Sequence, residues 1–77
     1  MVRPTSVTNS IRALRFAKGE MTQAELAERI GVTRQTVIAI EQGRYSPSLE
    51  MAFRIARAFD VPLDEVFQYP DSEGETR

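Results

Sequence analysis

Residues 21–48 read MTQAELAERIGVTRQTVIAIEQGRYSPS and contain two helix-start signals separated by a glycine. The first is a capping box, in which the Thr22 hydroxyl accepts from the backbone N–H of Glu25 and the Glu25 carboxylate accepts from that of Thr22. Gly31 is expected to end this helix, because a sharp helix end favours a residue that adopts the left-handed conformation. The apolar residues between these ends predict a buried stripe: Leu26, Ala27 and Ile30.

The second signal is Thr33, which is expected to cap a helix running to about Gln42 and closed by the following glycine. Val37 and Ile40 are three residues apart in this helix and therefore face inward together. Two short helices joined through residues 31–33 form a helix-turn-helix.

The flanking sequence predicts three further helices. Asn9 can cap a first helix that ends at Gly19, Ser48 can cap a fourth, and Pro62 restarts the chain into a last turn at residues 63–67. The fold class is therefore all-α with five helices, because no strand-like alternation is long enough to compete. The core stripe expected on the fourth helix consists of Leu49, Ala52, Phe53, Ala56 and Phe59.

A chain of 77 residues holds one domain. We expect a flexible N-terminal arm at residues 1–9, the helix-turn-helix domain at residues 10–69 and a disordered acidic tail at residues 70–77. The chain has no Cys and no His, which excludes thiolate or imidazole metal sites and a His-based catalytic pair. We therefore expect no enzyme, no cofactor and no small-molecule ligand. The sequence has no signal-like or membrane-spanning run, so we expect a cytoplasmic protein with no membrane partner.

The formal net charge of −1 conceals a segregation of charge along the chain. Nine basic and five acidic residues precede Asp60, whereas from Asp60 onward six acidic residues face a single Arg. Nucleic-acid-binding domains usually carry a basic excess on the surface that faces phosphates. The two ends of the chain are therefore expected to serve different roles.

With these landmarks in place, the chain closely resembles the lambda-repressor-like (Cro/C1, Xre-type) helix-turn-helix family, from about residue 11 to residue 67. The landmarks in common, in order, are Thr22-Gln23, Leu26-Ala27, Gly31-Val32, Glu41-Gln42-Gly43 and Pro47. The resemblance is greatest to compact stand-alone members, and it implies a five-helix DNA-binding domain. The segment Gly19-Glu20-Met21 is one residue longer than the usual spacing, which should lengthen only a loop.

The resemblance also implies a structural ion pair between Arg15 on the first helix and Glu41 near the end of the recognition helix. If such a pair is buried, losing one partner costs about 3 to 5 kcal/mol, because a charge is left without compensation.

A recognition helix presents its first turn and one face to base edges in the major groove. Arg pairs bidentately with guanine and Gln with adenine, so Arg34 and Gln35 are candidate base readers. By resemblance, the base-reading positions fall on Arg34, Gln35 and Ala39, and Ala39 can pack on a thymine methyl or permit close approach. Ile38 lies on the same face and either contacts DNA or closes the edge of the core. The alternative for Arg34 and Gln35 is an ordinary solvated helix start.

Contacts to the sugar-phosphate backbone are expected around this helix. Gln23 begins the second helix, where free N–H groups attract a phosphate, and the resemblance places a phosphate-contacting Gln there. Arg12 and Lys18 are more simply a charged surface face that adds long-range attraction, and Arg3 could belong to a minor-groove arm. The other candidate phosphate contacts are Thr33, Thr36, Arg44, Tyr45 and Ser46.

One such helix spans only a few base pairs, so a homodimer reading a near-palindrome on double-stranded DNA is expected. The apolar residues of the fourth helix and the C-terminal segment exceed what a small core needs, although a single well-filled core is the alternative. The candidate dimer interface comprises Met51, Ile55, Ala58, Val66, Phe67 and Tyr69.

Three functions fit these patterns. The first is a transcriptional regulator, more specifically a repressor that occupies its operator. The second is the antitoxin half of a two-protein system, which a neighbouring toxin gene would favour. The third is a protein-interaction adaptor that keeps the fold without binding DNA. The set Gln23, Arg34, Gln35 and Arg44 argues against the adaptor.

Overall fold

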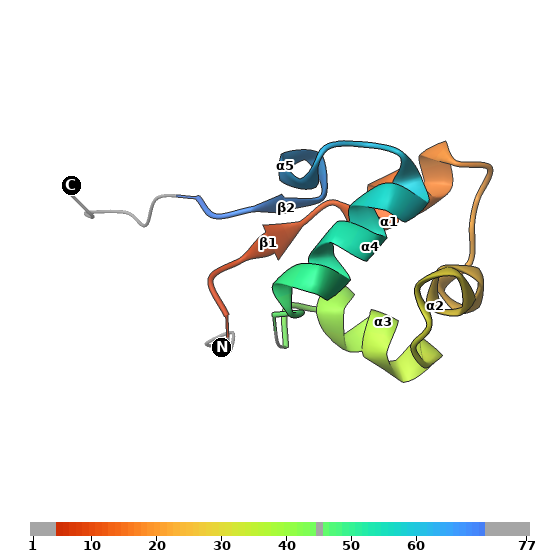
Figure 1. Ribbon diagram of the computed structural model, residues 1–77, viewed down its shortest axis with the longest axis horizontal. Coiled ribbons are helices and arrows are strands. Elements are labelled where there is room, and N and C mark those ends of the chain that lie inside the picture. The colour runs from red at the N-terminus through yellow and green to blue at the C-terminus, as the bar shows by residue number, and fades with distance from the viewer. Residues whose placement is uncertain (1–4, 45, 71–77) are drawn as a thin grey trace.

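The computed structural model describes residues 5–44 and 46–70, and five short helices make up most of this part (Figure 1). The helices are α1 (Ile11–Ala17), α2 (Gln23–Ile30), α3 (Arg34–Glu41), α4 (Leu49–Phe59) and α5 (Leu63–Val66). Three of the sequence-predicted caps are present: the side chains of Thr22, Thr33 and Ser48 accept from the backbone N–H three residues later. The all-α class is confirmed, and none of the helices in the described residues is long and apolar enough to cross a lipid bilayer.

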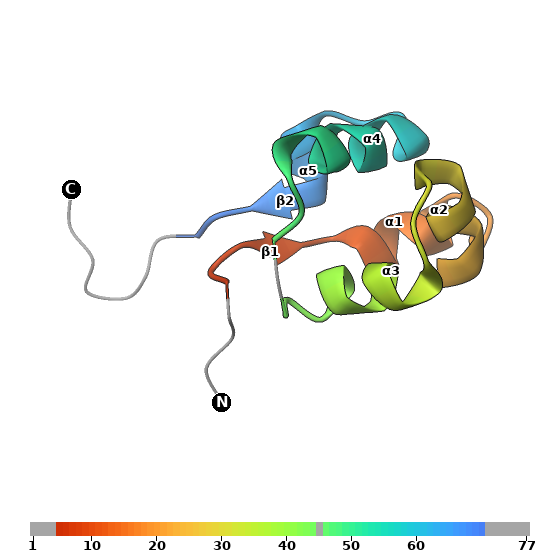
Figure 2. The ribbon, with the colours of Figure 1, turned by 60° about the horizontal axis from the view of Figure 1, so that its bottom comes forward.

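The helices enclose one core (Figure 2). α2 packs against both α3 and α4, and the views place α3 and α4 on opposite sides of the domain. The largest fully buried side chains come from all five helices: Phe59, Ile11, Leu26, Ile40, Ile55, Val37 and Val66. The residues that fix α3 in place are therefore part of the same core that holds α4.

Two strands, β1 (Thr8–Asn9) and β2 (Phe67–Gln68), form a short antiparallel pair that the sequence analysis did not foresee. Thr8 pairs with Gln68 and Asn9 with Phe67, so the residues before α1 lie beside those after α5. Thr8 and Asn9 thus belong to the folded domain and not to an N-terminal arm. Residues 1–4 of the expected arm and 71–77 of the expected tail lie outside the described residues.

The start of α1 also differs from the expectation. The capping position is Ser10, whose side chain makes no capping hydrogen bond, and Asn9 instead accepts from the backbone N–H of Ile11 at 3.1 Å. The amide of Asn9 donates to the carbonyls of Ile40 at 3.0 Å and Glu41 at 3.4 Å. Asn9 therefore ties β1 to the end of α3.

The buried face of α4 is rotated relative to the expected stripe. Leu49 and Phe53 are 67% and 49% exposed, whereas Ile55 is 1% exposed and lies in the core. The buried residues of this helix are Ala52, Ile55, Ala56 and Phe59. The prediction for Leu49 and Phe53 was wrong because α4 carries apolar residues around more than half of its circumference, so periodicity alone could not select the inward face.

Candidate nucleic-acid interface

The outward face of α3 begins at its first turn. Thr33 caps the helix by accepting from the backbone N–H of Thr36 at 3.2 Å, and the two hydroxyl oxygens lie 3.1 Å apart. Arg34 and Gln35 follow directly and are exposed. Val37 and Ile40 are buried on the opposite face, so the first turn is held against the core while its polar side chains face solvent.

Ile38 and Ala39, the other two candidate base readers, are half-buried. Ile38 is one turn beyond Arg34 and Ala39 one turn beyond Gln35, so all four residues lie on one side of the helix. The helix therefore presents two long polar side chains at its start and two apolar side chains along its length.

The ion pair expected between Arg15 and Glu41 is present. Nε of Arg15 donates to Oε2 of Glu41 at 2.7 Å and Nη2 donates to Oε1 at 3.2 Å, and the side chains are 9% and 10% exposed. Nη1 of Arg15 donates to the backbone carbonyl of Met21 at 2.9 Å. This bidentate pair joins α1 to the end of α3, and the carbonyl bond fixes the loop before α2.

That loop holds the one-residue extension noted in the sequence. Gly19 and Glu20 both have positive φ, at 80° and 60°, and Met21 is buried. The backbone N–H of Met21 returns to the carbonyl of Arg15 at 2.8 Å. The extension is therefore absorbed in a tight loop, and α1 and α2 keep their places against α3.

Gln23 is the first residue of α2 and is half-buried. Its side-chain amide donates to Oε1 of Glu41 at 3.3 Å. Both capping-box hydrogen bonds are present just before it, between Thr22 and Glu25. The start of α2 is thus linked to the end of α3 through the carboxylate that also holds Arg15.

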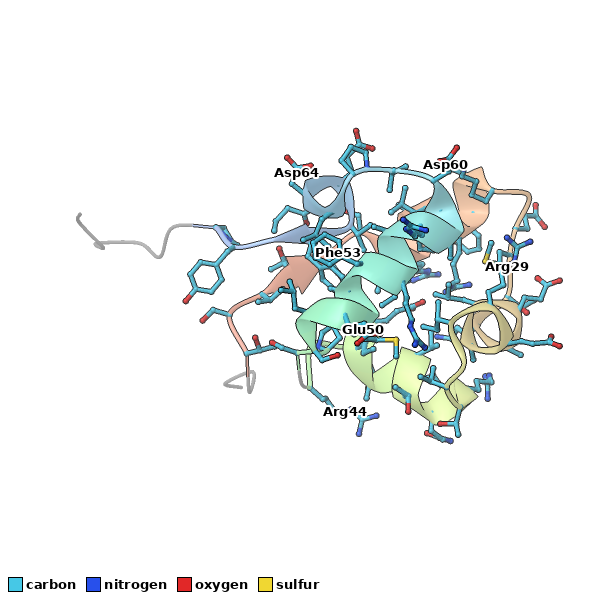
Figure 3. The ribbon with its side chains drawn as sticks, viewed as in Figure 1. Arg29, Arg44, Glu50, Phe53, Asp60 and Asp64 are labelled. Atoms are coloured by element: carbon cyan, nitrogen blue, oxygen red, sulfur yellow. The ribbon has the colours of Figure 1, made fainter. Side chains whose placement is uncertain are left out.

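The segment after α3 carries the remaining candidate phosphate contacts. Arg44 is exposed, and Ser46 is exposed with its hydroxyl 2.6 Å from that of Thr5. Tyr45 lies outside the described residues. Arg44 projects from the α3 edge of the domain, whereas Asp60 and Asp64 lie at the opposite edge (Figure 3). The charge segregation along the sequence is therefore also a separation in space.

A family model described as helix-turn-helix matches residues 11–66, which covers all five helices. The chain belongs to the helix-turn-helix family. This family is one of transcriptional regulators of the Cro/C1 type and not of enzymes, so the resemblance noted in the sequence is confirmed.

Helix-turn-helix relatives match this chain over most of its length. It is 53% identical over 53 residues to an uncharacterised HTH-type transcriptional regulator of Methanocaldococcus jannaschii, covering 69% of this chain and 80% of that protein. It is 38% identical over 66 residues to the cryptic phage CTXphi transcriptional repressor RstR of Vibrio cholerae, covering 86% of this chain and 57% of the repressor. The restriction-modification controller protein C.AhdI of Aeromonas hydrophila superposes with a TM-score of 0.65 at 36% identity, covering 71% of this chain and 78% of that chain.

An open cleft of about 750 Å³ lies between α1, the start of α2 and α3 of this helix-turn-helix domain. Gln23 and Arg34 line it together with Arg12, Phe16 and Gln42. The sequence analysis did not select Phe16 or Gln42 and assigned Arg12 to a solvated face. Phe16 was detectable as the one aromatic residue of the first helix that lies off the stripe formed by Ile11 and Leu14.

The candidate dimer residues divide into two groups in the structure. Ile55 and Val66 are 1% and 0% exposed and belong to the core, so they are unavailable to a partner. Met51, Ala58 and Phe67 are partly buried against that core, and Tyr69 is 73% exposed. The sequence analysis counted core residues as surplus because it placed the inward face of α4 incorrectly.

The exposed apolar surface lies elsewhere on α4 and α5. We define the apolar patch as Leu49, Phe53, Leu63, Phe67 and Tyr69. Two shallow grooves of about 300 and 400 Å³ share Val7, Leu63 and Phe67 in their walls and run along this surface. Phe53 projects from α4 away from α3 (Figure 3). The apolar patch and the polar face of α3 are therefore separate surfaces of the domain.

Proposed function

We propose that this chain is a repressor that binds a near-palindromic DNA operator as a homodimer, with α3 in the major groove. The observation that supports this most directly is the outward face of α3. Arg34 and Gln35 are exposed at its first turn while Val37 and Ile40 hold its other face in the core. A rigid helix with free polar side chains at its start is the geometry that base reading in the major groove requires.

Base selectivity is assigned to this face. The guanidinium of Arg34 pairs with guanine O6 and N7 and the amide of Gln35 with adenine N7 and N6, each discriminating by about 1 to 3 kcal/mol. Ala39 and Ile38 supply apolar surface one turn further along, where a thymine methyl can pack.

Backbone contacts are assigned to residues that surround α3. Gln23 lies at the start of α2, where backbone N–H groups and the helix dipole favour a phosphate. Its amide donates to Glu41 through one N–H, so the second N–H remains to contact a phosphate oxygen. Arg44 and Ser46 follow α3 at the same edge, and Thr33 and Thr36 frame its first turn.

The homodimer is assigned to the apolar patch. Leu49 and Tyr69 are 67% and 73% exposed, which leaves apolar area that a second copy can cover. A twofold pair of α3 helices about 34 to 36 Å apart would enter successive major grooves. The repressor role is supported by the similarity to a phage repressor, and occupation of an operator is sufficient to obstruct transcription.

Selection of bound sequences from random duplexes tests this proposal. The expected result is an inverted repeat whose half-site centres lie about one helical turn apart. Selection of a single unrepeated motif would contradict the homodimer, and the absence of any enriched sequence at low ionic strength would contradict base reading.

A further inference from the structure

One wall of the cleft is formed by α1, which carries Arg12 and Phe16 one turn apart. The other walls include Gln23 at the start of α2 and Arg34 at the start of α3. The α1 wall is therefore continuous with the surface to which the proposed function assigns DNA contacts.

Phe16 is unusual because it is a large apolar side chain that remains 53% exposed on a helix whose apolar stripe faces the core. Two guanidinium groups lie against its ring: the Cζ atom of Arg12 is 5.5 Å from the ring centroid and that of Arg15 is 5.7 Å away. Arg15 is itself fixed by Glu41 and the Met21 carbonyl. Phe16 thus connects an immobilised arginine to an exposed one.

Arg12 differs from Arg15 in lacking a carboxylate partner. Within the part of the chain that the structure describes, the two ion pairs are Arg15 with Glu41 and Arg54 with Glu50. Of the charged residues that line the cleft, Arg12 and Arg34 face a single unpaired carboxylate, Glu20, since Arg15 and Glu41 neutralise each other. The cleft therefore has a positive balance to which Arg12 contributes.

We propose that Arg12 binds a phosphate of the same DNA strand that passes Gln23, and that Phe16 holds the Arg12 guanidinium in position for this contact. This inference rests on the proposed function and adds α1 to the DNA-binding surface. The occupant of the cleft is the sugar-phosphate backbone, because the walls combine free guanidinium groups with amide donors from Gln23 and Gln42.

The role of Phe16 follows from the entropy of the arginine side chain. A freely rotating Arg loses rotamer freedom when it binds a phosphate, whereas one that rests on an aromatic ring has lost part of it already. Phe16 is thus a positioning residue, and Arg12 is the contact. The prediction is that the effect of Phe16 on DNA affinity depends on the presence of Arg12.

The test measures DNA affinity against salt concentration, using the operator selected by the wild-type protein. Arg12→Ala should reduce the magnitude of the slope of log K against log salt by about 0.9, the value for one lost phosphate contact. Lys18→Ala is the matched control, because it removes one positive charge from the C-terminal end of α1 outside the cleft. Equal slope changes for the two variants would reduce Arg12 to long-range attraction and overturn the proposal.

A double-mutant cycle tests Phe16. Phe16→Ala should weaken binding about three-fold in the wild-type background and have no further effect in the Arg12→Ala background. An equal loss in both backgrounds would show that Phe16 does not act through Arg12. Both side chains are exposed, so circular dichroism should report an unchanged fold.

Ethylation of single phosphates locates the contact. One phosphate whose ethylation blocks the wild-type protein should become neutral for Arg12→Ala, next to the phosphate assigned to Gln23. Identical ethylation patterns for the two proteins would overturn the inference while leaving the proposed function intact. A wild-type protein that binds no DNA at all would instead reject the proposed function itself.

Discussion

The α3 side and the α4–α5 side of this small domain are stabilised in different ways. On the α3 side, a buried Arg15–Glu41 pair, two capped helix starts and the Asn9 amide fix the positions of polar groups. On the α4–α5 side, the exposed groups are apolar, and Leu49, Phe53 and Tyr69 are about half or more exposed. The first surface is organised for directional contacts and the second for nondirectional burial.

This difference suggests how a single domain can carry two interfaces. Hydrogen bonds from a rigid helix give base discrimination, because a misplaced donor loses its partner. An apolar patch tolerates small displacements, so it suits a contact between two copies. The following predictions test whether the two sides behave as differently as the structure indicates, in decreasing order of their effect on the free energy of unfolding.

The largest expected effect is at the buried ion pair. Glu41→Ala should lower the free energy of unfolding by about 3 to 5 kcal/mol, because it leaves the Arg15 guanidinium buried without a counter-charge. Urea denaturation followed by circular dichroism measures this. The matched control is Glu50→Ala, which breaks the exposed pair with Arg54 and should cost less than about 1 kcal/mol. Similar small losses for both variants would contradict the structural role of the buried pair.

An intermediate effect is expected at the caps. Thr33→Ala and Ser48→Ala each remove a side-chain acceptor for a backbone N–H and should each cost about 1 kcal/mol of stability. Only Thr33 caps the proposed reading helix, so only Thr33→Ala should also weaken DNA binding. If both variants reduced DNA affinity equally at matched stability, the assignment of separate roles to the two sides would fail.

The smallest effect on stability is expected in the apolar patch. The double change Leu49→Asp and Phe53→Asp should alter the free energy of unfolding by less than about 1 kcal/mol, because both side chains are largely solvated in the single chain. It should convert a dimer to a monomer in sedimentation equilibrium. Ala13→Asp, at an exposed position of α1, is the control and should leave the mass unchanged. A wild-type protein that is monomeric at all concentrations would contradict the dimer.

The helix-turn-helix could be predicted from sequence because its signals are local. Thr22, Glu25 and Thr33 act on backbone groups three residues away, so their spacing alone specifies two helix starts. The Arg15–Glu41 pair was also foreseen, but only through the family resemblance, since nothing local relates residues 26 positions apart.

Features that depend on tertiary packing were not predicted. The pairing of Thr8–Asn9 with Phe67–Gln68 joins residues about 60 positions apart in strands too short to show alternation. The inward face of α4 was misplaced because Leu49, Phe53 and Ile55 are equally apolar in the sequence. The cleft draws its walls from three helices, so the proximity of Phe16 to Arg12 and Gln23 appears only in the folded chain.

The central claim is that the first turn of α3 reads bases while the segment after it holds the backbone. The most direct measurement compares Gln35→Ala with Arg44→Ala across operator variants and salt concentrations. Gln35→Ala should lose preference at one base pair per half-site and keep its salt dependence, whereas Arg44→Ala should weaken all sequences alike and lower the salt slope by about 1. Equal losses on every sequence for Gln35→Ala would contradict the claim.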